Sequence, residues 1–265
     1  MTDHELQNRQ RELWASGDLA TFAARIVIVS ELLCETVDLR AGERVLDVAA
    51  GTGNTAIAAA RRWCDVVGID FVPELLDRAR ERAKAESLAI DFRHGDAEAI
   101  PFPDHSFDVV LSTFGVMFAV DQSQTAAELL RVCRRGGRIG LANFPPDSLA
   151  ARFGRAASRL VPPPRGVQPP TLWGTERGLR RLFGRDVPLS LTRRTVRMRY
   201  PSPQAGVDFF RAHFGPVRET FEALDPEGQR ELAQALAHLV SESNVSGDGT
   251  VVAAWDYVEV IVTNE

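Results

Sequence analysis

The chain is poor in cysteine and histidine, and it lacks the arrangements of these residues that bind metal ions. Cys34, Cys64 and Cys133 are isolated from one another, without a Cys-x-x-Cys pair, and the five histidines show no metal-ligand spacing. This usage predicts a reducing compartment and no metal site.

The chain also lacks a long uninterrupted apolar run and an excess of basic residues. Its most apolar stretch, 19–37, contains Arg25, Glu31 and Glu35, so it cannot span a membrane. The first five residues are polar and acidic, unlike a signal peptide. A net charge of −5 argues against a nucleic-acid-binding protein. We therefore expect a cytoplasmic protein, monomeric or homodimeric, without a nucleic-acid partner or a membrane span.

Strand-like and helix-like segments alternate in the first 143 residues. An amphipathic helix is predicted over 19–36, and Asp121 is predicted to begin a helix, with Gln124 as its capping-box partner, that Gly136 and Gly137 end. Strands are predicted at 43–49, 65–70, 90–94, 107–113 and 138–143, with helices through Arg62 and over 73–85. This alternation predicts an α/β fold with a doubly wound parallel sheet.

The pattern changes after Pro145. The segment 161–170 contains five prolines and is predicted to be an extended loop or lid hinge. Beyond it we predict helices at 176–183, 204–213 and 217–241 and strands at 189–200 and 251–262. We expect one domain over 1–265, with a core of about 37–144 and 185–265. The cap is expected from about 1–36, 145–184 and the helices within 203–241.

A glycine-rich turn follows the first predicted strand. The segment 51–56 matches the pattern GxGxxG/A, and Asp70 follows about 20 residues later. Glycines allow the backbone to approach a ligand, and the acidic residue can accept hydrogen bonds from ribose hydroxyls. The pattern by itself also permits NAD, or a turn that needs glycine only for its backbone angles.

Two further carboxylates favour a cationic ligand over a dinucleotide. Asp47 directly precedes the turn, where it would repel a pyrophosphate and attract an ammonium or sulfonium group. Its alternative role is to hold the N–H groups of the turn. Asp96 follows the third predicted strand and is placed to accept a hydrogen bond from an adenine amine. Phe71 is predicted to lie against the adenine face or, equally, in the core.

Four segments resemble class I S-adenosylmethionine-dependent methyltransferases, in the "type 11" group similar to quinone-biosynthesis enzymes. They are VLDVAAGTGNTA, GIDF, GDAEAIPFPDHSFDVVLS and RVCRRGGRIGLANF, within about 43–144. One departure is Arg135, where the family commonly has proline. The resemblance implies a Rossmann-like, mostly parallel seven-stranded sheet with an antiparallel last strand and a helical cap. The predicted cofactor-binding residues are Asp47, Ala49, Gly51, Gly53, Asp70, Phe71, Asp96, Ala97 and Thr113.

The acceptor side carries weaker signals. In the family, the N-terminal helix and a segment between late strands close over the substrate. A predicted apolar acceptor pocket, with core packing as the alternative, comprises Trp14, Phe114, Met117, Phe118, Trp173 and Phe214. A hydroxyl acceptor requires a base, and the candidates are His94, His105 and His213. Eight arginines over 177–199 either recognise an anionic acceptor or form a solvated strand face.

These features together predict a methyltransferase that uses S-adenosylmethionine, releases S-adenosylhomocysteine and acts on a small-molecule oxygen, nitrogen or carbon nucleophile. Two alternatives stay open at this point. One is an NAD-dependent oxidoreductase, which the glycine pattern permits. The other is a non-catalytic ligand-binding protein on the same fold.

Overall fold

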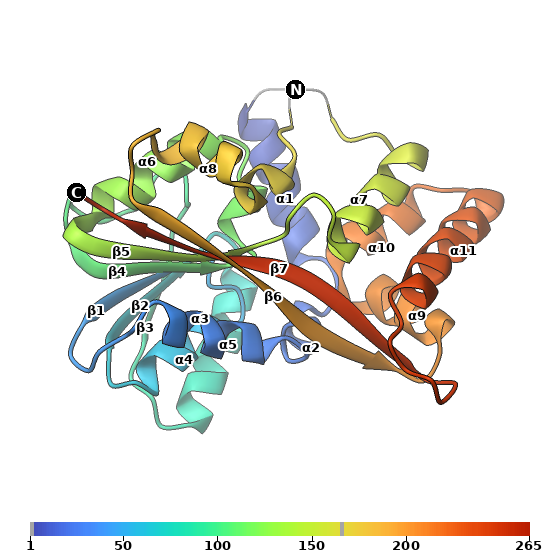
Figure 1. Cartoon of the computed structure of the whole chain (residues 1–265), viewed down its shortest axis with the longest axis horizontal. Coiled ribbons are helices and arrows are strands. Elements are labelled where there is room, and N and C mark those ends of the chain that lie inside the picture. Colours follow the sequence, from blue (N-terminus) through green and yellow to red (C-terminus); the bar gives the residue numbers. More distant parts are fainter. Residues whose placement is uncertain (1–2, 165–166) are drawn as a thin grey trace.

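The computed structural model describes residues 3–164 and 167–265, and its strands form one seven-stranded sheet in the order β3-β2-β1-β4-β5-β7-β6 (Figure 1). The strands are β1 (Arg44–Val48), β2 (Asp65–Asp70), β3 (Asp91–His94), β4 (Phe107–Thr113), β5 (Cys133–Asn143), β6 (Leu189–Tyr200) and β7 (Val251–Thr263). The first five strands are parallel, and β7 is antiparallel to both of its neighbours, β5 and β6. The predicted Rossmann-like fold with an antiparallel last strand is therefore confirmed.

Helices cover both faces of the sheet and one end of it. The helices near the sheet are α3 (Val27–Thr36), α4 (Asn54–Ala60), α5 (Pro73–Ala85), α6 (Gln122–Val132) and α8 (Glu176–Phe183). Figure 1 shows α6 and α8 above the sheet and α3 to α5 below it. The remaining helices are α1 (Asp3–Ala15), α2 (Leu19–Ala23), α7 (Leu149–Leu160), α9 (Pro203–His213), α10 (Gly215–Glu222) and α11 (Pro226–Glu242). Helices α7, α9, α10 and α11 lie beside the far ends of β6 and β7 (Figure 1).

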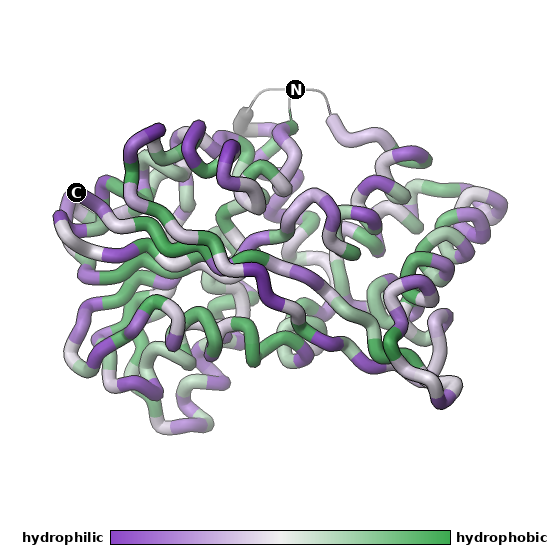
Figure 2. The backbone as a smooth tube through the Cα atoms, viewed as in Figure 1, coloured by the Kyte–Doolittle hydropathy of each residue, from purple (hydrophilic) through white to green (hydrophobic). Residues whose placement is uncertain are grey.

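Apolar side chains on both faces of the central strands form two hydrophobic clusters. Val45 of β1 belongs to the cluster below the sheet, and its neighbours Leu46 and Val48 belong to the cluster around α6 and α8. All three are completely buried, as expected for a parallel strand covered by helices on both faces. Figure 2 shows the same concentration of hydrophobic residues in the strands and in α3.

Most of the predicted boundaries agree with the structure, but the helix predicted over 19–36 is interrupted. Helix α2 ends at Ala23, and α3 begins at Val27 after Ile26, whose backbone is not helical. The break turns α2 away from α3 and brings Phe22 against Phe214, with ring centroids 4.9 Å apart. Tertiary packing of Phe22 therefore outweighs the continuous helical pattern.

The helix predicted over 217–241 is also two helices, α10 and α11. Pro226 begins α11, and the side chain of Asp225 accepts a hydrogen bond of 2.8 Å from the N–H of Gly228. Proline lacks an N–H group and clashes with the preceding turn, so it starts a helix more readily than it continues one.

The end of α6 differs from the prediction as well. Helix α6 stops at Val132, and Gly136 and Gly137 lie within β5 rather than at a helix terminus. At Gly137 a Cβ atom would lie 2.7 Å from Sγ of Cys133, so this part of the strand has no room for a side chain.

The predicted capping box of α6 is only half formed. Asp121 accepts a hydrogen bond from the N–H of Gln124, but its own N–H donates to Oε1 of Glu98, at 3.0 Å. The side chain of Gln124 donates instead to the carbonyl oxygen of Glu98. A carboxylate from a neighbouring loop therefore replaces the glutamine as the second half of the cap.

Helices α1 and α7 had no specific prediction within the expected cap. The proline-rich loop prediction includes residues 165 and 166, and the acidic start includes residues 1 and 2, all of which lie outside the described residues. Near the end of that loop, Pro170–Gly174 form a short 3-10 helix, η2. Within the described ranges, no helix is both long and apolar enough to cross a membrane.

Candidate active site

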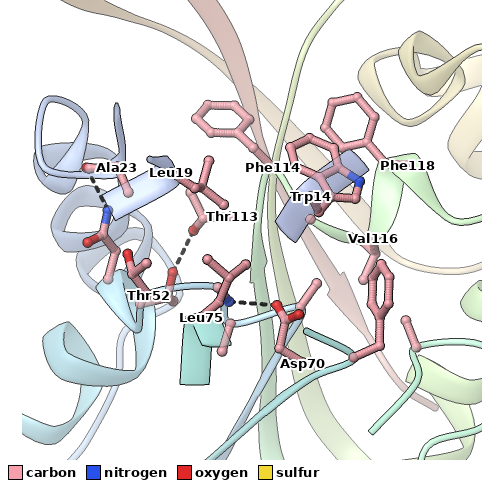
Figure 3. A pocket seen from close by; sticks show the side chains of 18 of the residues that line it. Trp14, Leu19, Ala23, Thr52, Asp70, Leu75, Thr113, Phe114, Val116 and Phe118 are labelled. Atoms are coloured by element: carbon pink, nitrogen blue, oxygen red, sulfur yellow. Dashed lines mark hydrogen bonds between the residues drawn. The ribbon is translucent and has the colours of Figure 1, made fainter. Parts of the chain in front are cut away.

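A cavity of about 160 Å³ lies at the carboxyl ends of the parallel strands (Figure 3). The loops that follow β1, β2, β3 and β4 form one wall, and α1 and α2 contribute the opposite wall. Strands β1 and β4 are neighbours, while β2 and β3 continue on the other side of β1, so the strand order reverses at this point. Ligands of open α/β sheets bind in the crevice at such a reversal.

The turn after β1 has an unusual backbone. Ala49 and Gly51 both have positive φ angles, 56° and 53°, and both line the cavity. Phe114, after the adjacent strand β4, also has a positive φ angle of 54° and lines the same space. Left-handed alanine and phenylalanine are sterically unfavourable, and such strain concentrates at ligand sites.

Asp70 holds this turn from the end of β2. Its Oδ2 atom accepts a hydrogen bond of 2.8 Å from the N–H of Gly51 (Figure 3). Its Oδ1 atom accepts one of 2.9 Å from the N–H of Val72. Burial raises the pKa of Asp70 to about 6, although the two backbone donors act in the opposite direction. The buried carboxylate of Asp70 is thus held in place at the wall of the cavity.

Asp47 lies behind the turn and does not line the cavity. Its Oδ2 atom accepts a hydrogen bond of 2.9 Å from the N–H of Ala56, in the first turn of α4, while its Oδ1 atom has no partner among the described residues. Burial, with a smaller contribution from the nearby Asp70 carboxylate, raises the pKa of Asp47 to about 8, although the N–H of Ala56 acts in the opposite direction. Asp47 therefore holds the first turn of α4, and its predicted attraction of a cationic ligand stays a prediction.

Gly53 is likewise needed for packing rather than for the cavity wall. It precedes α4 with a φ angle of 83°, and a Cβ atom there would lie 3.0 Å from Cβ of Ala79 and 3.1 Å from the ring of Phe92. It is not among the residues that line the cavity. Its place in the glycine pattern reflects the close approach of α4 to α5 and β3.

A row of hydroxyl groups crosses the cavity floor. Oγ1 of Thr55 lies 3.0 Å from Oγ of Ser30 and donates to Oγ1 of Thr113 at 2.8 Å (Figure 3). These residues come from α3, α4 and β4, and all three line the cavity. The row connects the glycine-rich turn to the strand that carries the acceptor-side aromatics.

The loops after β2 and β3 bring Phe71, Asp96 and Ala97 to the cavity, as their predicted cofactor role requires. Oδ1 of Asp96 accepts a hydrogen bond of 2.9 Å from the N–H of Glu98. Glu98 also lines the cavity, and its carboxylate accepts hydrogen bonds from the N–H of Val120 and from the side chain of Gln7. The loop after β3 is therefore joined directly to α1.

Aromatic rings line the other end of the cavity. The ring of Trp14 lies 4.9 Å from that of Phe118 and 5.8 Å from that of Phe214 (Figure 3). Phe114 is stacked on Phe144 with ring centroids 4.2 Å apart. All five rings line the cavity and are only half-buried, so they present apolar surface to it.

Two residues predicted for the acceptor pocket are elsewhere. Met117 and Trp173 are completely buried in the cluster around α6 and α8 and do not line the cavity. Trp173 packs edge-on against Phe183 of α8, with ring centroids 5.6 Å apart. For these two residues the alternative of core packing applies, because both are fully buried among the apolar side chains of that cluster.

None of the three candidate histidines lines the cavity. His94 and His105 are exposed, and Nδ1 of His105 lies 3.1 Å from the carbonyl oxygen of Cys133. His213 lies 3.8 Å from Asp18 and packs against Phe209. Across residues 3–164 and 167–265, no group of three or more His, Cys, Asp or Glu side chains is arranged to hold a metal ion.

All the charged side chains among the described residues that line the cavity are acidic. Its described lining includes the carboxylates of Asp70, Asp96 and Glu98, and it includes no lysine, arginine or histidine. None of the arginines of 177–199 reaches it, and Arg193 and Arg194 form ion pairs with Asp256 and Glu259. A pyrophosphate would face these carboxylates without a cationic partner, whereas a cationic ligand would be attracted.

Several residues of the site were not found from the sequence. Gln7 and Gln10 of α1, Ser30 of α3, and Phe22 and Phe144 all line the cavity. Phe144 ends the segment RVCRRGGRIGLANF and could have been proposed from that position, whereas the other four lie outside the four segments and reach the site through tertiary packing of separate elements. Glu98 likewise lies within the quoted segment after β3 and could have been proposed from its position there.

Known proteins share both the motifs and the fold. A family model described as a methyltransferase domain matches residues 45–137. An uncharacterized protein of Mycobacterium tuberculosis is 38% identical over 94% of this chain and 91% of its own length. The demethylmenaquinone methyltransferase of Deinococcus radiodurans is 50% identical over 107 residues, which are 40% of this chain and 44% of that protein.

Among solved structures, the YcgJ protein of Bacillus subtilis superposes with a TM-score of 0.61 at 19% identity, over 89% of this chain and 98% of that one. The chain belongs to the class I S-adenosylmethionine-dependent methyltransferase family. In this methyltransferase the residues that match the family model include the loops after the parallel strands. The match excludes α1 and ends before Phe144, so Trp14, Phe144 and Phe214 of the five rings described above lie outside it.

Proposed function

We propose that this methyltransferase binds S-adenosylmethionine in the cavity and transfers its methyl group to a small, apolar acceptor. The observation that carries the proposal is the negative charge of the cavity lining: Asp70 at the end of β2 and Asp96 and Glu98 in the loop after β3 line it, and no described basic side chain does. The acidic lining suits a sulfonium-bearing cofactor and disfavours the pyrophosphate of NAD. The comparisons give the NAD alternative no support.

The chain's own residues would divide the work between the two ends of the cavity. Asp70 and Asp96 would accept hydrogen bonds from the cofactor's hydroxyl and amine groups, and the left-handed turn at Gly51 would allow close backbone approach. Bound S-adenosylmethionine supplies an activated methyl group, whose transfer leaves a neutral thioether. Trp14 and the surrounding phenylalanines would orient the acceptor and exclude water.

The lining favours an acceptor that needs little help in losing its proton. The nucleophile forms a bond to the methyl carbon as the carbon–sulfur bond breaks, and any proton it carries passes to solvent or to a carboxylate. No histidine lines the described cavity, so we propose an amine or an activated carbon ahead of an unactivated hydroxyl.

Titration calorimetry with S-adenosylmethionine tests the cofactor assignment. Asp70→Ala should weaken binding by about 1–3 kcal/mol, because it removes acceptors that face the ligand and hold the turn. Asp91→Ala is the matched control, since Asp91 is an exposed residue of the neighbouring strand whose carboxylate pairs with Arg93. Absence of binding by folded wild-type protein, or tight binding of NADH, would overturn the proposal.

Turnover distinguishes an enzyme from a ligand-binding protein on the same fold. Release of S-adenosylhomocysteine should be screened with amines, phenols and quinone precursors. We expect release with at least one apolar acceptor, and Trp14→Ala should reduce it. Cofactor binding without release by any acceptor would favour the non-catalytic alternative.

A further inference from the structure

A second cavity, of about 310 Å³, shares no lining residue with the first and is lined by three arginines. Arg25 comes from the connection between α2 and α3, and Arg197 and Arg199 come from the end of β6. Figure 1 shows the end of β6 running beside α9, toward the helices that cover the far end of the sheet. No carboxylate is among the described residues that line this space.

The three arginines lack the ion pairs that their neighbours make. Within the described part of the chain, no Asp or Glu lies within 4.0 Å of any of their guanidinium groups. On the same strand, Arg193 pairs with Asp147 and Asp256, and Arg194 pairs with Glu259. In a chain with more acidic than basic residues, three unpaired arginines around one cavity leave a local positive charge unbalanced.

The rest of the cavity reinforces that charge. Pro201 and Ala205 line it, and they bracket the beginning of the 11-residue helix α9. The N-terminal end of a helix carries a partial positive charge, although here the N–H of Ala205 already donates to Oγ of Ser202, so the arginines carry the site. Phe209 provides an apolar wall, with the guanidinium carbon of Arg25 5.4 Å from its ring centroid.

Protection of an edge strand explains only part of this arrangement. Strand β6 is at the edge of the sheet, and charged residues on edge strands prevent pairing with other chains. That role accounts for Arg197 and Arg199. It does not account for Arg25, which belongs to a different element, or for the hollow that the three share with the helix terminus.

We propose that this cavity binds a phosphate-bearing anion, held by Arg25, Arg197 and Arg199 at the beginning of α9. Guanidinium groups present paired N–H donors that match the oxygens of a phosphate. Three guanidinium groups together offer more N–H donors than one carboxylate can accept. The site is separate from the methyl-transfer cavity, so its existence does not depend on the proposed methyltransferase activity.

Calorimetry with inorganic pyrophosphate tests the site in the intact chain. Wild-type protein should bind it saturably in 150 mM NaCl, and acetate should bind at least tenfold more weakly. The double variant Arg197→Gln, Arg199→Gln should raise the Kd for pyrophosphate at least tenfold. Arg193→Gln is the matched control, because it removes the same charge from a paired position on the same strand and should change the Kd less than twofold.

A second variant and a second ligand keep the test decisive. Circular dichroism would reveal whether the double variant unfolds. Arg25 lies outside β6, so Arg25→Gln should weaken pyrophosphate binding independently of that outcome. Sedimentation with phosphatidylcholine vesicles, with and without phosphatidic acid, distinguishes a lipid headgroup from a dissolved phosphate as the source. Binding of neither pyrophosphate nor acidic vesicles by wild-type protein, or equal weakening by Arg193→Gln, would overturn the proposal.

Discussion

The two ends of the main cavity are built in different ways. The end with the carboxylates consists of short loops directly after β1, β2 and β3, held by backbone hydrogen bonds such as the one from Gly51 to Asp70. The aromatic end consists of side chains from elements far apart in sequence, among them Trp14 and Phe214. A loop between buried strands has little freedom, whereas helices that meet through apolar side chains can repack. We therefore expect substitutions at the first end to affect folding and cofactor binding together, and those at the second to affect acceptor turnover alone.

The largest effect should come from Gly53→Ala. The substitution places a Cβ atom in a left-handed conformation and 3.0 Å from Ala79, which should lower the free energy of unfolding by about 1–3 kcal/mol and weaken cofactor binding. Urea denaturation measures the first effect and calorimetry the second. Gly154→Ala is the control, because Gly154 is helical and an added Cβ would project into open space, and we expect it to stabilise the protein by about 0.5–1 kcal/mol.

Asp47 should make stability depend on pH. Its pKa is about 8 in the folded protein and about 4 when exposed, so the folded state favours the protonated form. That contribution is complete below about pH 4 and is lost as the pH rises toward 8. Asp47→Asn should therefore gain stability relative to wild type by more than about 1 kcal/mol between pH 5 and pH 8. Urea denaturation at each pH measures the free energy of unfolding of both proteins. A difference between them that stays constant from pH 5 to pH 8 would contradict the argument from burial.

Trp14→Ala tests the aromatic end. Loss of its contacts with Phe118 and Phe214 should reduce kcat/KM for an apolar acceptor about tenfold, equivalent to about 1.4 kcal/mol, and change cofactor affinity less than threefold. Trp63→Ala is the control, because Trp63 is 84% exposed and should have no effect on either quantity. An equal loss of cofactor affinity would show that the two ends are not independent.

The smallest effect should appear where α1 contacts the loop after β3, which contains Glu98. Gln7→Leu removes the 2.9 Å hydrogen bond to Glu98 and should raise the dissociation rate of S-adenosylmethionine about threefold, since one such bond contributes about 0.5–1.5 kcal/mol. Arg9→Gln breaks the exposed pair that joins the same helix to Glu219 of α10. Stopped-flow displacement should show no change for this second variant, because neither Arg9 nor Glu219 lines the cavity.

The difference between the two ends also explains which predictions succeeded. The boundaries of β2, α5, β4, α8 and β6 agree with those expected, since each has a strong periodic pattern and a clear start or stop signal. Gly51 of the glycine-rich turn and Asp96 and Ala97 of the loop after β3 line the cavity because they follow strands directly, and their cofactor contacts stay a prediction. Met117 and Trp173 were misplaced because aromatic and apolar character in a sequence does not distinguish a cavity wall from a core.

The sequence by itself determined the α/β architecture, the position of the turn and the carboxylates that follow the strands. It did so because these depend on hydrophobic periodicity and on residues that are neighbours along the chain. Tertiary structure alone decided that Asp47 does not line the cavity, that the chain breaks at Ile26 and Phe22 lines the cavity, and that Arg25 and Arg197 line one second cavity. Those outcomes depend on burial and on contacts between distant elements, which no local pattern records.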